Sequence, residues 1–279
     1  MRNIIIQKTL KTVLITGASG GLGNLTSLLF AKRGWLVIAT IHHLDLIEGF
    51  ETHSNIKYYI IDVTSFESIE KAKNEILKEY KTIDVIINNA GKGYRSFVEL
   101  SCDKEIDSII NVNLLGVIKI CRAFIPTFRT QNYGQFINIT SVAGLVNLPL
   151  GSFYHSTKQA VESFSECMSY ELSDFNISVC TVQFGNVPTD FQKNVVKSQI
   201  SEIKHYNIMM NKINAFLEKK TCKNIHLLDH ILEKLYTIAE NPNKSYRKYT
   251  IGFDANCIKY LRRLLGYRIF NFVVKKKIL

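Results

Sequence analysis

The sequence predicts an α/β fold in which helices cover both faces of a doubly wound parallel β-sheet, giving three layers. Two observations support this prediction. Short apolar runs rich in valine and isoleucine recur along the chain, and segments with helical periodicity separate them. In addition, no linker rich in glycine, serine or proline and no internal repeat divides the 279 residues. We therefore expect a single domain, with a ligand crevice at the carboxyl ends of the strands.

Six segments have the composition expected of buried strands, being short, apolar and rich in β-branched residues. Because strands and helical segments alternate, we expect right-handed crossovers and a parallel sheet. The predicted strands are residues 12–16, 36–40, 57–61, 84–88, 135–140 and 177–183.

Helical periodicity occupies the intervals between the predicted strands. Thr64, followed three residues later by Glu67, resembles a capping box and predicts the start of one helix. The intervals 103–128 and 152–173 also carry apolar residues at helical spacing. The apolar residues that share a face are Leu22, Leu25, Leu28 and Leu29 after the first strand, and Ile69, Ala72, Ile76, Leu77 and Tyr80 after the third.

A glycine-rich turn, TGASGGLG at 16–23, follows the first predicted strand and precedes a helix. Gly17, Gly21 and Gly23 permit the turn and a close approach, so the backbone amides and the helix dipole can receive a pyrophosphate. The turn alone is a weak indicator of a nucleotide site, because glycines also mark ordinary tight turns. Its spacing also departs from the GxGxxG pattern.

Tyr154 and Lys158 give a more specific signal, because four residues are one helical turn and place the phenol and the ammonium on one face. A nearby cation offsets the cost of presenting a phenolate, since a free tyrosine has a pKa of about 10. Together with Ser141 they supply a proton donor, a hydrogen bond to a developing alkoxide and a positive field. Taken singly, Ser141 is equally explained as a strand-end cap, Asn113 as a mid-helix polar residue and Tyr154 as a surface phenol.

The order and spacing of these motifs resemble those of short-chain dehydrogenases/reductases over essentially the whole chain. The resemblance implies a Rossmann-like sheet of about seven strands in one domain, residues 1–279. It also implies a nicotinamide cofactor, interconversion of a carbonyl and an alcohol, and a homodimer or homotetramer. The matching segments are TGASGGLG at 16–23, NNAG at 88–91, Asn113 in NVNLLG, Ser141 in ITSVAG, and Tyr154 with Lys158 in YHSTK.

Four catalytic roles are implied by this resemblance. Tyr154 donates a proton to the carbonyl oxygen, and Ser141 polarises that oxygen. Lys158 lowers the pKa of the tyrosine and holds the nicotinamide ribose. Asn113 orders the water through which protons reach Lys158.

The resemblance also implies the residues that bind the cofactor and no metal site. Asn89, Ala90 and Gly91 match the segment along the adenosine and ribose, and Asp62 with Val63 matches the pair that meets adenine. One departure is Phe184, which replaces the proline usual in relatives and leaves the nicotinamide geometry open. The full implied set is Gly17, Ser19, Gly20, Gly21, Leu22, Gly23, His42, Asp62, Val63, Asn89, Ala90, Gly91, Tyr154, Lys158, Gly185, Val187 and Thr189.

The choice between NADP(H) and NAD(H) depends on the end of the second predicted strand. By the resemblance, Ile41 stands where relatives that prefer NAD carry an acidic residue, so nothing there repels a 2′-phosphate. His42 stands where many relatives that prefer NADP carry arginine, although a mostly neutral imidazole is a weaker phosphate ligand. Asp45 is near enough to reach the ribose, and Gly20 occupies a place where some NADP users carry a basic residue. We expect NADP(H) to be favoured over NAD(H).

Residues 190–220 form the most individual part of the chain, and by the resemblance residues 190–245 are a substrate lid and helical insertion that closes over the substrate. Its apolar side chains predict a lipophilic substrate, since apolar contact area is what they offer. The alternative is that these residues simply cover the sheet. The sequence from Arg247 onward resembles the ends of relatives that act on retinol, hydroxysteroids or acyl-dihydroxyacetone phosphate.

The net charge of +11 is concentrated at the carboxyl end, where seven basic and no acidic residues follow residue 258; removing them leaves +4. Without a recognition motif, this distribution argues against nucleic acid as a partner. Residues 254–279 predict a basic amphipathic C-terminal helix that rests on anionic lipid or, alternatively, packs on its own domain or a partner subunit. The residues of its apolar face are Leu261, Leu264, Leu265, Ile269, Phe272 and Val273.

The location of the protein is predicted from its cysteines and apolar runs. The six cysteines form no CxxC pair, which favours a reducing compartment. The first residues, MRNIIIQKTLK, have too short an apolar run for a signal peptide, and no run elsewhere approaches membrane-spanning length. We expect a cytoplasmic enzyme, with any peripheral contact with a membrane confined to the C-terminal helix.

Two hypotheses of other classes remain. A protein of this fold can bind a dinucleotide as a redox sensor without turnover, an interpretation that gains from a lost catalytic position; none is lost in this sequence. A membrane-surface scaffold is the second hypothesis, and it requires the basic tail to carry the function.

Overall fold

The computed structural model describes residues 10–43, 46, 51–189, 191–198, 201–223 and 226–278. Its centre is a seven-stranded sheet in the order β3-β2-β1-β4-β6-β7-β9, with every neighbouring pair parallel. The predicted doubly wound α/β fold is therefore confirmed. The strands are β1 Thr12–Ile15, β2 Leu36–Ile41, β3 Ile56–Ile60, β4 Val85–Asn88, β6 Gly134–Ile139, β7 Ile177–Phe184 and β9 Arg247–Ile251.

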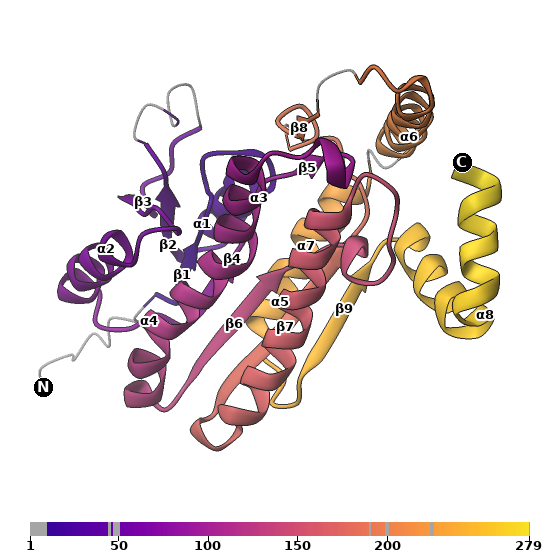
Figure 1. Ribbon diagram of the computed structural model, residues 1–279. Helices are drawn as coiled ribbons and strands as arrows, with labels where there is room; N and C mark the ends of the chain where they lie inside the picture. The colour runs from indigo at the N-terminus through magenta and orange to yellow at the C-terminus, as the bar shows by residue number, and fades with distance from the viewer. Residues whose placement is uncertain are drawn as a thin grey trace, which may run out of the picture.

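Helices cover both faces of this sheet (Figure 1). The helices α1 Gly21–Lys32 and α7 Leu227–Glu240 share one apolar core with the sheet. The helices α2 Phe66–Glu79, α4 Gly116–Gln131 and α5 Ser152–Glu171 share the other. A shorter helix, α3 Asp103–Ile110, runs into α4 through the π-helical turn Asn111–Leu115, and 3₁₀ turns occupy Val98–Leu100, Val142–Gly144 and Ser173–Phe175.

The start of α2 differs by one residue from the predicted capping box. Ser65, rather than Thr64, is the N-cap, because its hydroxyl accepts a hydrogen bond from the backbone N of Ser68 at 3.1 Å. Thr64 instead donates through its hydroxyl to Asp62 at 2.7 Å. Glu67 accepts from the Ser65 hydroxyl at 2.9 Å, so the reciprocal bond of a capping box is absent at the positions expected from the sequence.

Among the described residues, the helical stretch Asp103–Gln131 is long and apolar enough by composition to cross a membrane, with a mean hydropathy of 1.6. The sequence analysis had expected no such segment. Ile120, Phe124 and Phe128 in this stretch are fully buried against the sheet. We therefore assign it as a core helix.

The segment predicted as a lid, residues 190–245, divides into parts with different positions. The strand β8 Val196–Lys197 pairs with β5 Tyr94–Arg95 in a small second sheet, and the helix α6 Lys204–Lys223 follows it. By contrast, α7 packs beside α1 under the sheet and takes no part in a lid.

The predicted C-terminal helix is present as α8 Phe253–Ile278 but is not one continuous rod. Gly266 has φ 62° and ψ −176°, which are not helical angles, so the chain bends there. Figure 1 shows α8 folding back on itself in this region, with its end near α6. The apolar residues predicted to share one helical face are therefore divided between two helical segments.

Candidate active site

A cavity of about 660 Å³ lies at the carboxyl ends of the central strands. Gly17 follows β1, Gly91 follows β4, Ser141 follows β6 and Gly185 follows β7, and all four line it. The order of the sheet reverses at β1, which pairs with both β2 and β4. This is the place where doubly wound sheets bind their ligands.

The glycine-rich turn is held in shape by the strand next to it. Thr16 Oγ1 accepts hydrogen bonds from the backbone N of Asn89 and of Ala90, both at 3.0 Å. The Asn89 side chain donates to the carbonyl oxygens of Thr16 and Gly17 at 3.0 and 3.1 Å. Asn89 therefore fixes the turn that would receive a dinucleotide.

Gly23 lies beneath this turn. A Cβ at residue 23 would stand 2.3 Å from the Gly17 carbonyl oxygen and 2.6 Å from the Asn89 side-chain nitrogen. Such contacts are far closer than van der Waals packing permits. A residue without a side chain is required for the turn to close on the helix.

The turn and the start of α1 fit the pyrophosphate of a dinucleotide. The N-cap residue, Gly20, makes no side-chain capping bond, and the first turn of α1 carries no acidic residue. A Cβ at Gly20 would meet no atom within 4 Å, so this position faces open space. Ser19, Gly20, Gly21 and Leu22 line the cavity, where the amides and dipole of α1 favour an anion.

Ser141, Tyr154 and Lys158 are brought together in the wall of the same cavity. Ser141 Oγ caps a 3₁₀ turn by accepting from the Ala143 N at 3.2 Å, and it also shares a hydrogen bond with Tyr154. Burial raises the pKa of Tyr154 to about 12, and the bond with Ser141 lowers it in part. The resemblance implies that Lys158 lowers the pKa of Tyr154, but in this structure burial has the larger effect and the pKa is raised. The phenol is therefore protonated at neutral pH.

Lys158 is 6% exposed and points along α5 toward the end of β6. Its Nζ donates to the carbonyl oxygen of Ile139 at 3.1 Å and lies 5.9 Å from the centre of the Tyr154 ring. Burial lowers its pKa to about 8, and the charge of Glu162 opposes that lowering. The ammonium is thus the fixed cation of the site.

Asn113 is fully buried at the π-helical turn between α3 and α4. Its Oδ1 accepts from the Lys92 N at 2.8 Å, and its Nδ2 donates to the Lys92 carbonyl oxygen at 2.9 Å. A Cβ built on Gly91 would meet Asn113 Oδ1 at 3.4 Å and Lys158 Nζ at 3.7 Å. Asn113 Oδ1 and Lys158 Nζ therefore both border Gly91.

Of the residues predicted for the adenosine end, Asn89, Ala90 and Gly91 line the cavity, whereas His42, Asp62 and Val63 follow β2 and β3 and are not part of its lining. His42 is exposed, and its Nε2 stands 4.0 Å from Asp62 Oδ2. Burial acts to raise the pKa of Asp62, but hydrogen bonds from Thr64 and the charge of His42 outweigh it and lower that pKa. Val63 packs against Gly116, where a Cβ would approach it to 2.9 Å. Asp45, the alternative ribose contact, lies outside the described residues.

The segment after β7 faces the glycine-rich turn despite the replacement of proline by Phe184. A Cβ on Gly21 would lie 3.1 Å from the Cβ of Thr189, so these two residues meet. The Thr189 N donates to the Val187 carbonyl oxygen at 2.9 Å. Gly185, Val187 and Thr189, which the resemblance implies bind the cofactor, line the cavity, and Phe184 lines it as well.

The far end of the cavity is apolar and is built by α6 and α8. Ile213 and Phe216 come from α6, while Ile258 and Phe270 come from the two segments of α8. Leu261 and Val273, predicted as part of a lipid-facing surface, line this end as well. Leu264, Ile269 and Phe272 of the predicted face are exposed, at 79%, 53% and 65%, and Leu261 is still 47% exposed although it borders the cavity.

Two residues in the cavity wall were missed by the sequence analysis. Arg95 on β5 donates to Asn214 of α6 at 2.9 Å and to Gln192 at 3.2 Å, so it ties α6 to the sheet side of the site. His155 places Nδ1 2.6 Å from the Val146 carbonyl oxygen and 3.1 Å from that of Ala143. Since a carbonyl only accepts, this nitrogen carries the hydrogen. No motif marks Arg95, whereas His155 follows Tyr154 in the YHSTK motif.

Comparison with known proteins gives a family and a fold. A family model described as short chain dehydrogenase matches residues 11–200. A 3-ketodihydrosphingosine reductase from Bacteroides thetaiotaomicron is 35% identical over 195 residues, which are 70% of each chain. An NADP-dependent 3-hydroxy acid dehydrogenase from Schizosaccharomyces pombe is 33% identical over 210 residues, covering 72% of this chain and 80% of the relative.

Among solved structures, a short-chain dehydrogenase from Streptomyces avermitilis superposes with a TM-score of 0.82. The alignment covers 97% of this chain and 98% of the other at 22% sequence identity. At this identity, the likeness establishes the fold.

Proposed function

Because this chain belongs to the short-chain dehydrogenase/reductase family and is an NAD(P)-dependent oxidoreductase, we propose that it interconverts a carbonyl and an alcohol on a lipophilic substrate. One observation carries this proposal. A single cavity has the glycine-rich turn at one end, Ser141, Tyr154 and Lys158 in its wall, and apolar side chains of α6 and α8 at its other end. The name of the Bacteroides relative, a lipid-related reductase, agrees with an apolar substrate.

The residues of the cavity divide the chemistry among them. A bound nicotinamide dinucleotide supplies or accepts the hydride. Tyr154, held as a phenol by burial, donates its proton to the carbonyl oxygen as that oxygen gains charge. The Ser141 hydroxyl stabilises the same oxygen, and the Lys158 ammonium provides the positive field beside both.

The direct test compares two substitutions of the same kind on one helix. NADPH oxidation by the wild type would be followed with retinoid, steroid, long-chain aldehyde and acyl-ketone substrates. Tyr154→Phe is expected to abolish turnover of the active substrate, because it removes only the proton donor. Tyr170→Phe, an exposed tyrosine at the end of α5, serves as the control. Unchanged turnover by Tyr154→Phe would overturn the proposed mechanism.

We propose NADP(H) as the favoured cofactor. Ile41 at the end of β2 leaves no carboxylate at that position, and His42 beside it is exposed and able to meet a 2′-phosphate. His42→Asp is expected to shift the ratio of kcat/KM values from NADPH toward NADH, because a carboxylate repels the phosphate and accepts from a ribose hydroxyl. His43→Asp, at the adjacent exposed residue, is the control. A tenfold preference of the wild type for NADH would contradict the assignment.

We also propose that the enzyme meets its substrate at an anionic membrane surface through α8. Leu264, Ile269 and Phe272 are exposed, and the basic residues Arg263 and Arg268 of the same helix are exposed beside them. Other apolar residues of α8 line the cavity, so this helix joins the surface to the site.

Liposome sedimentation at physiological salt tests the membrane proposal. The double variant Leu264→Asp and Phe272→Asp should pellet less with vesicles containing phosphatidylserine than the wild type does. Phe66→Asp changes a residue that is 44% exposed on α2, far in sequence from α8, and is the control. Equal pelleting of all three proteins would remove membrane contact from the proposal without affecting the oxidoreductase assignment.

A further inference from the structure

Glu162 continues the line of residues that Tyr154 and Lys158 begin on α5. The three residues are spaced by four, so they lie on the same face of the helix at successive turns. Tyr154 and Lys158 line the cavity, while Glu162 lies one turn deeper and is only 5% exposed. An acidic side chain is rarely buried to this degree unless other groups satisfy it.

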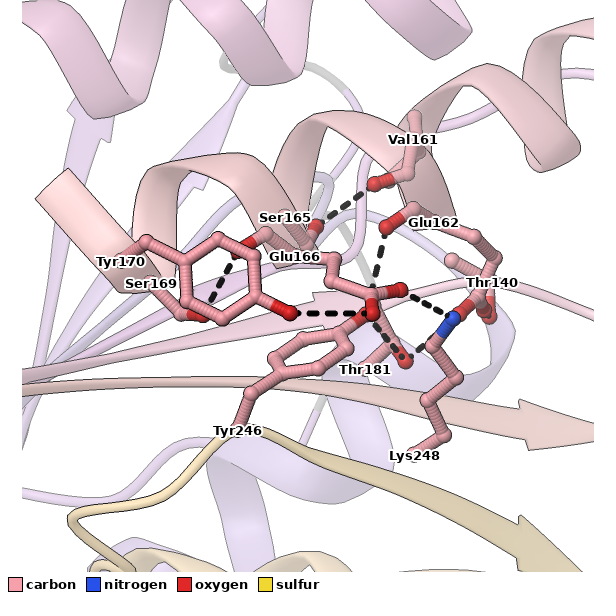
Figure 2. Close-up of polar contacts among 10 residues, drawn as sticks. All are labelled: Thr140, Val161, Glu162, Ser165, Glu166, Ser169, Tyr170, Thr181, Tyr246 and Lys248. Atoms are coloured by element: carbon pink, nitrogen blue, oxygen red, sulfur yellow. Dashed lines mark hydrogen bonds and ion pairs between the residues drawn. The ribbon is translucent and has the colours of Figure 1, made fainter.

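The Glu162 carboxylate is held by hydroxyl groups from two strands (Figure 2). Thr140, at the end of β6, donates to its Oε1, and Thr181 of β7 donates to its Oε2 at 2.8 Å. Tyr246 donates to the Glu162 backbone carbonyl oxygen at 3.2 Å and closes the same pocket from the side of β9. These donors carry no formal charge, so the hydrogen bonds do not neutralise the carboxylate.

The space for this side chain is also built into the fold. A Cβ on Gly144 would stand 3.2 Å from Glu162 Cγ and 3.6 Å from Oε1. Gly144 lies in the 3₁₀ turn that Ser141 caps, so the carboxylate packs directly beneath the loop that carries Ser141. Glu162 thus contacts Thr140 and Gly144, which flank Ser141 in the chain, and it is not part of the cavity wall.

We propose that Glu162 is a positioning residue of the reaction, whose buried negative charge keeps the Lys158 ammonium protonated and in place beside Tyr154 and the dinucleotide. The proposal rests on the proposed oxidoreductase function, since it assigns the support of the same site. Lys158 needs such support because burial lowers its pKa to about 8, and the charge of Glu162 is the influence that raises it.

Other ionisable groups near this pair come from α5, β7, and β9 with the residue before it. The carboxylate of Glu166, one turn further along α5, is exposed and is engaged by Lys248 of β9 at 2.6 Å. Its effect on Lys158 is therefore screened by solvent and by its own partner. Among the described residues, the other ionisable groups that interact with the pair are Tyr154 of α5, which lies near Lys158, and Cys180 of β7 and Tyr246 before β9, which lie near Glu162.

The pH dependence of NADPH binding, followed by nicotinamide fluorescence, tests the proposal without relying on turnover. Glu162→Gln keeps the shape and the hydrogen-bonding oxygen but removes the charge. The pH at which the ammonium is lost, and binding weakens, should fall by about one unit, as expected for removal of a nearby opposite charge. The same shift should appear in the alkaline limb of kcat/KM for reduction.

Two further variants separate charge from structure. Glu166→Gln makes the same change one helical turn away and should leave the alkaline midpoint where it is. Glu162→Asp keeps the charge and should return the midpoint toward that of the wild type. A folded Glu162→Gln variant with an unshifted midpoint would overturn the proposal, even if its activity were low.

A stability cycle gives a second test that also works if Glu162→Gln folds poorly. Lys158→Met should lower the thermal midpoint, because it leaves the buried carboxylate uncompensated. Adding Glu162→Gln to Lys158→Met should raise the midpoint again, whereas Glu162→Gln alone should not. A double variant no more stable than Lys158→Met would refute the charge pairing. Because this result needs no substrate, it distinguishes failure of this inference from failure of the proposed function.

Discussion

Replacement of Gly23 by alanine gives a sharp test of how the dinucleotide turn is built. The added Cβ would lie 2.3 Å from the Gly17 carbonyl oxygen, whereas ordinary contact begins near 3.4 Å, so backbone must retreat by about 1 Å. That movement strains the bonds from Asn89 to the carbonyl oxygens of Thr16 and Gly17. Overpacking costs about 1–3 kcal/mol and the loss of one buried hydrogen bond about 1 kcal/mol.

The expected total, roughly 3 kcal/mol, corresponds to a decrease in Tm of about 6–12 °C for a chain of this size. NADPH should also bind at least tenfold more weakly, because the amides that receive the pyrophosphate are displaced. Thermal denaturation and fluorescence titration measure the two effects. Gly20→Ala is the matched control in the same turn, since its φ of −159° suits any residue and its Cβ meets no atom within 4 Å.

The control is expected to melt within about 2 °C of the wild type. If Gly23→Ala behaved in the same way and bound NADPH with less than about threefold loss, the turn would have relaxed around the new methyl group. That outcome would refute the close packing of the turn against α1 as the reason for glycine at residue 23.

Three further predictions follow from the site. Tyr154→Phe should lower kcat by about 10²–10⁴ while leaving the Kd of NADPH within threefold, and an equal loss of binding in a fluorescence titration would contradict its role as proton donor. Arg95→Met removes the bonds to Asn214 and Gln192 and should raise KM about tenfold with little change in kcat; Lys197→Met, exposed on the same small sheet, is the kinetic control. The pKa of Lys158 is lowered from 10.5 to about 8 in the folded protein, so between these values the unfolded chain binds more protons, and Tm should rise with pH relative to Lys158→Met. Over the same interval kcat/KM for reduction should fall as the ammonium is lost, and a flat activity profile would argue against Lys158 as the cation of the site.

The sequence was sufficient to find six strands to within one residue at each end, because each is rich in apolar residues and, except for the edge strand β3, almost entirely buried in a parallel sheet. The seventh, β9, was not recognised by its pattern. It lies at the edge of the sheet, and Arg247 and Lys248 within it are exposed, so it lacks the apolar run that identified the others. Its existence was implied only by the expected family architecture.

Local motifs also predicted the residues that line the dinucleotide end of the cavity, since residues that follow parallel strands meet at one edge of the sheet. The sequence did not predict which residues of the C-terminal helix line the cavity. Helical spacing grouped Leu261 with Leu264 and Val273, but the bend at Gly266 puts Val273 on another helical segment, and Leu261 and Val273 line the cavity while Leu264 is 79% exposed. Tertiary packing decided this division, and no periodicity within the segment could reveal it.

Glu162 illustrates an intermediate case. Its spacing from Lys158 equals that of Lys158 from Tyr154, so helical geometry already placed it on the reactive face. The sequence could not show that Glu162 is buried, because its partners Thr140 and Thr181 come from the end of β6 and from β7, which are distant from it in the chain. Burial turns an ordinary helical glutamate into a group that affects the site.

The partition of the cavity along the chain has a consequence for protein engineering. The reacting side chains and the dinucleotide turn lie before residue 200, whereas α6 and α8, which contribute apolar residues to the other part of the wall, lie after it. A chimera that receives its last eighty or so residues from another such enzyme would inherit new selectivity while retaining the reaction. Because α6 and α8 contact each other and both line the cavity, they should be exchanged together.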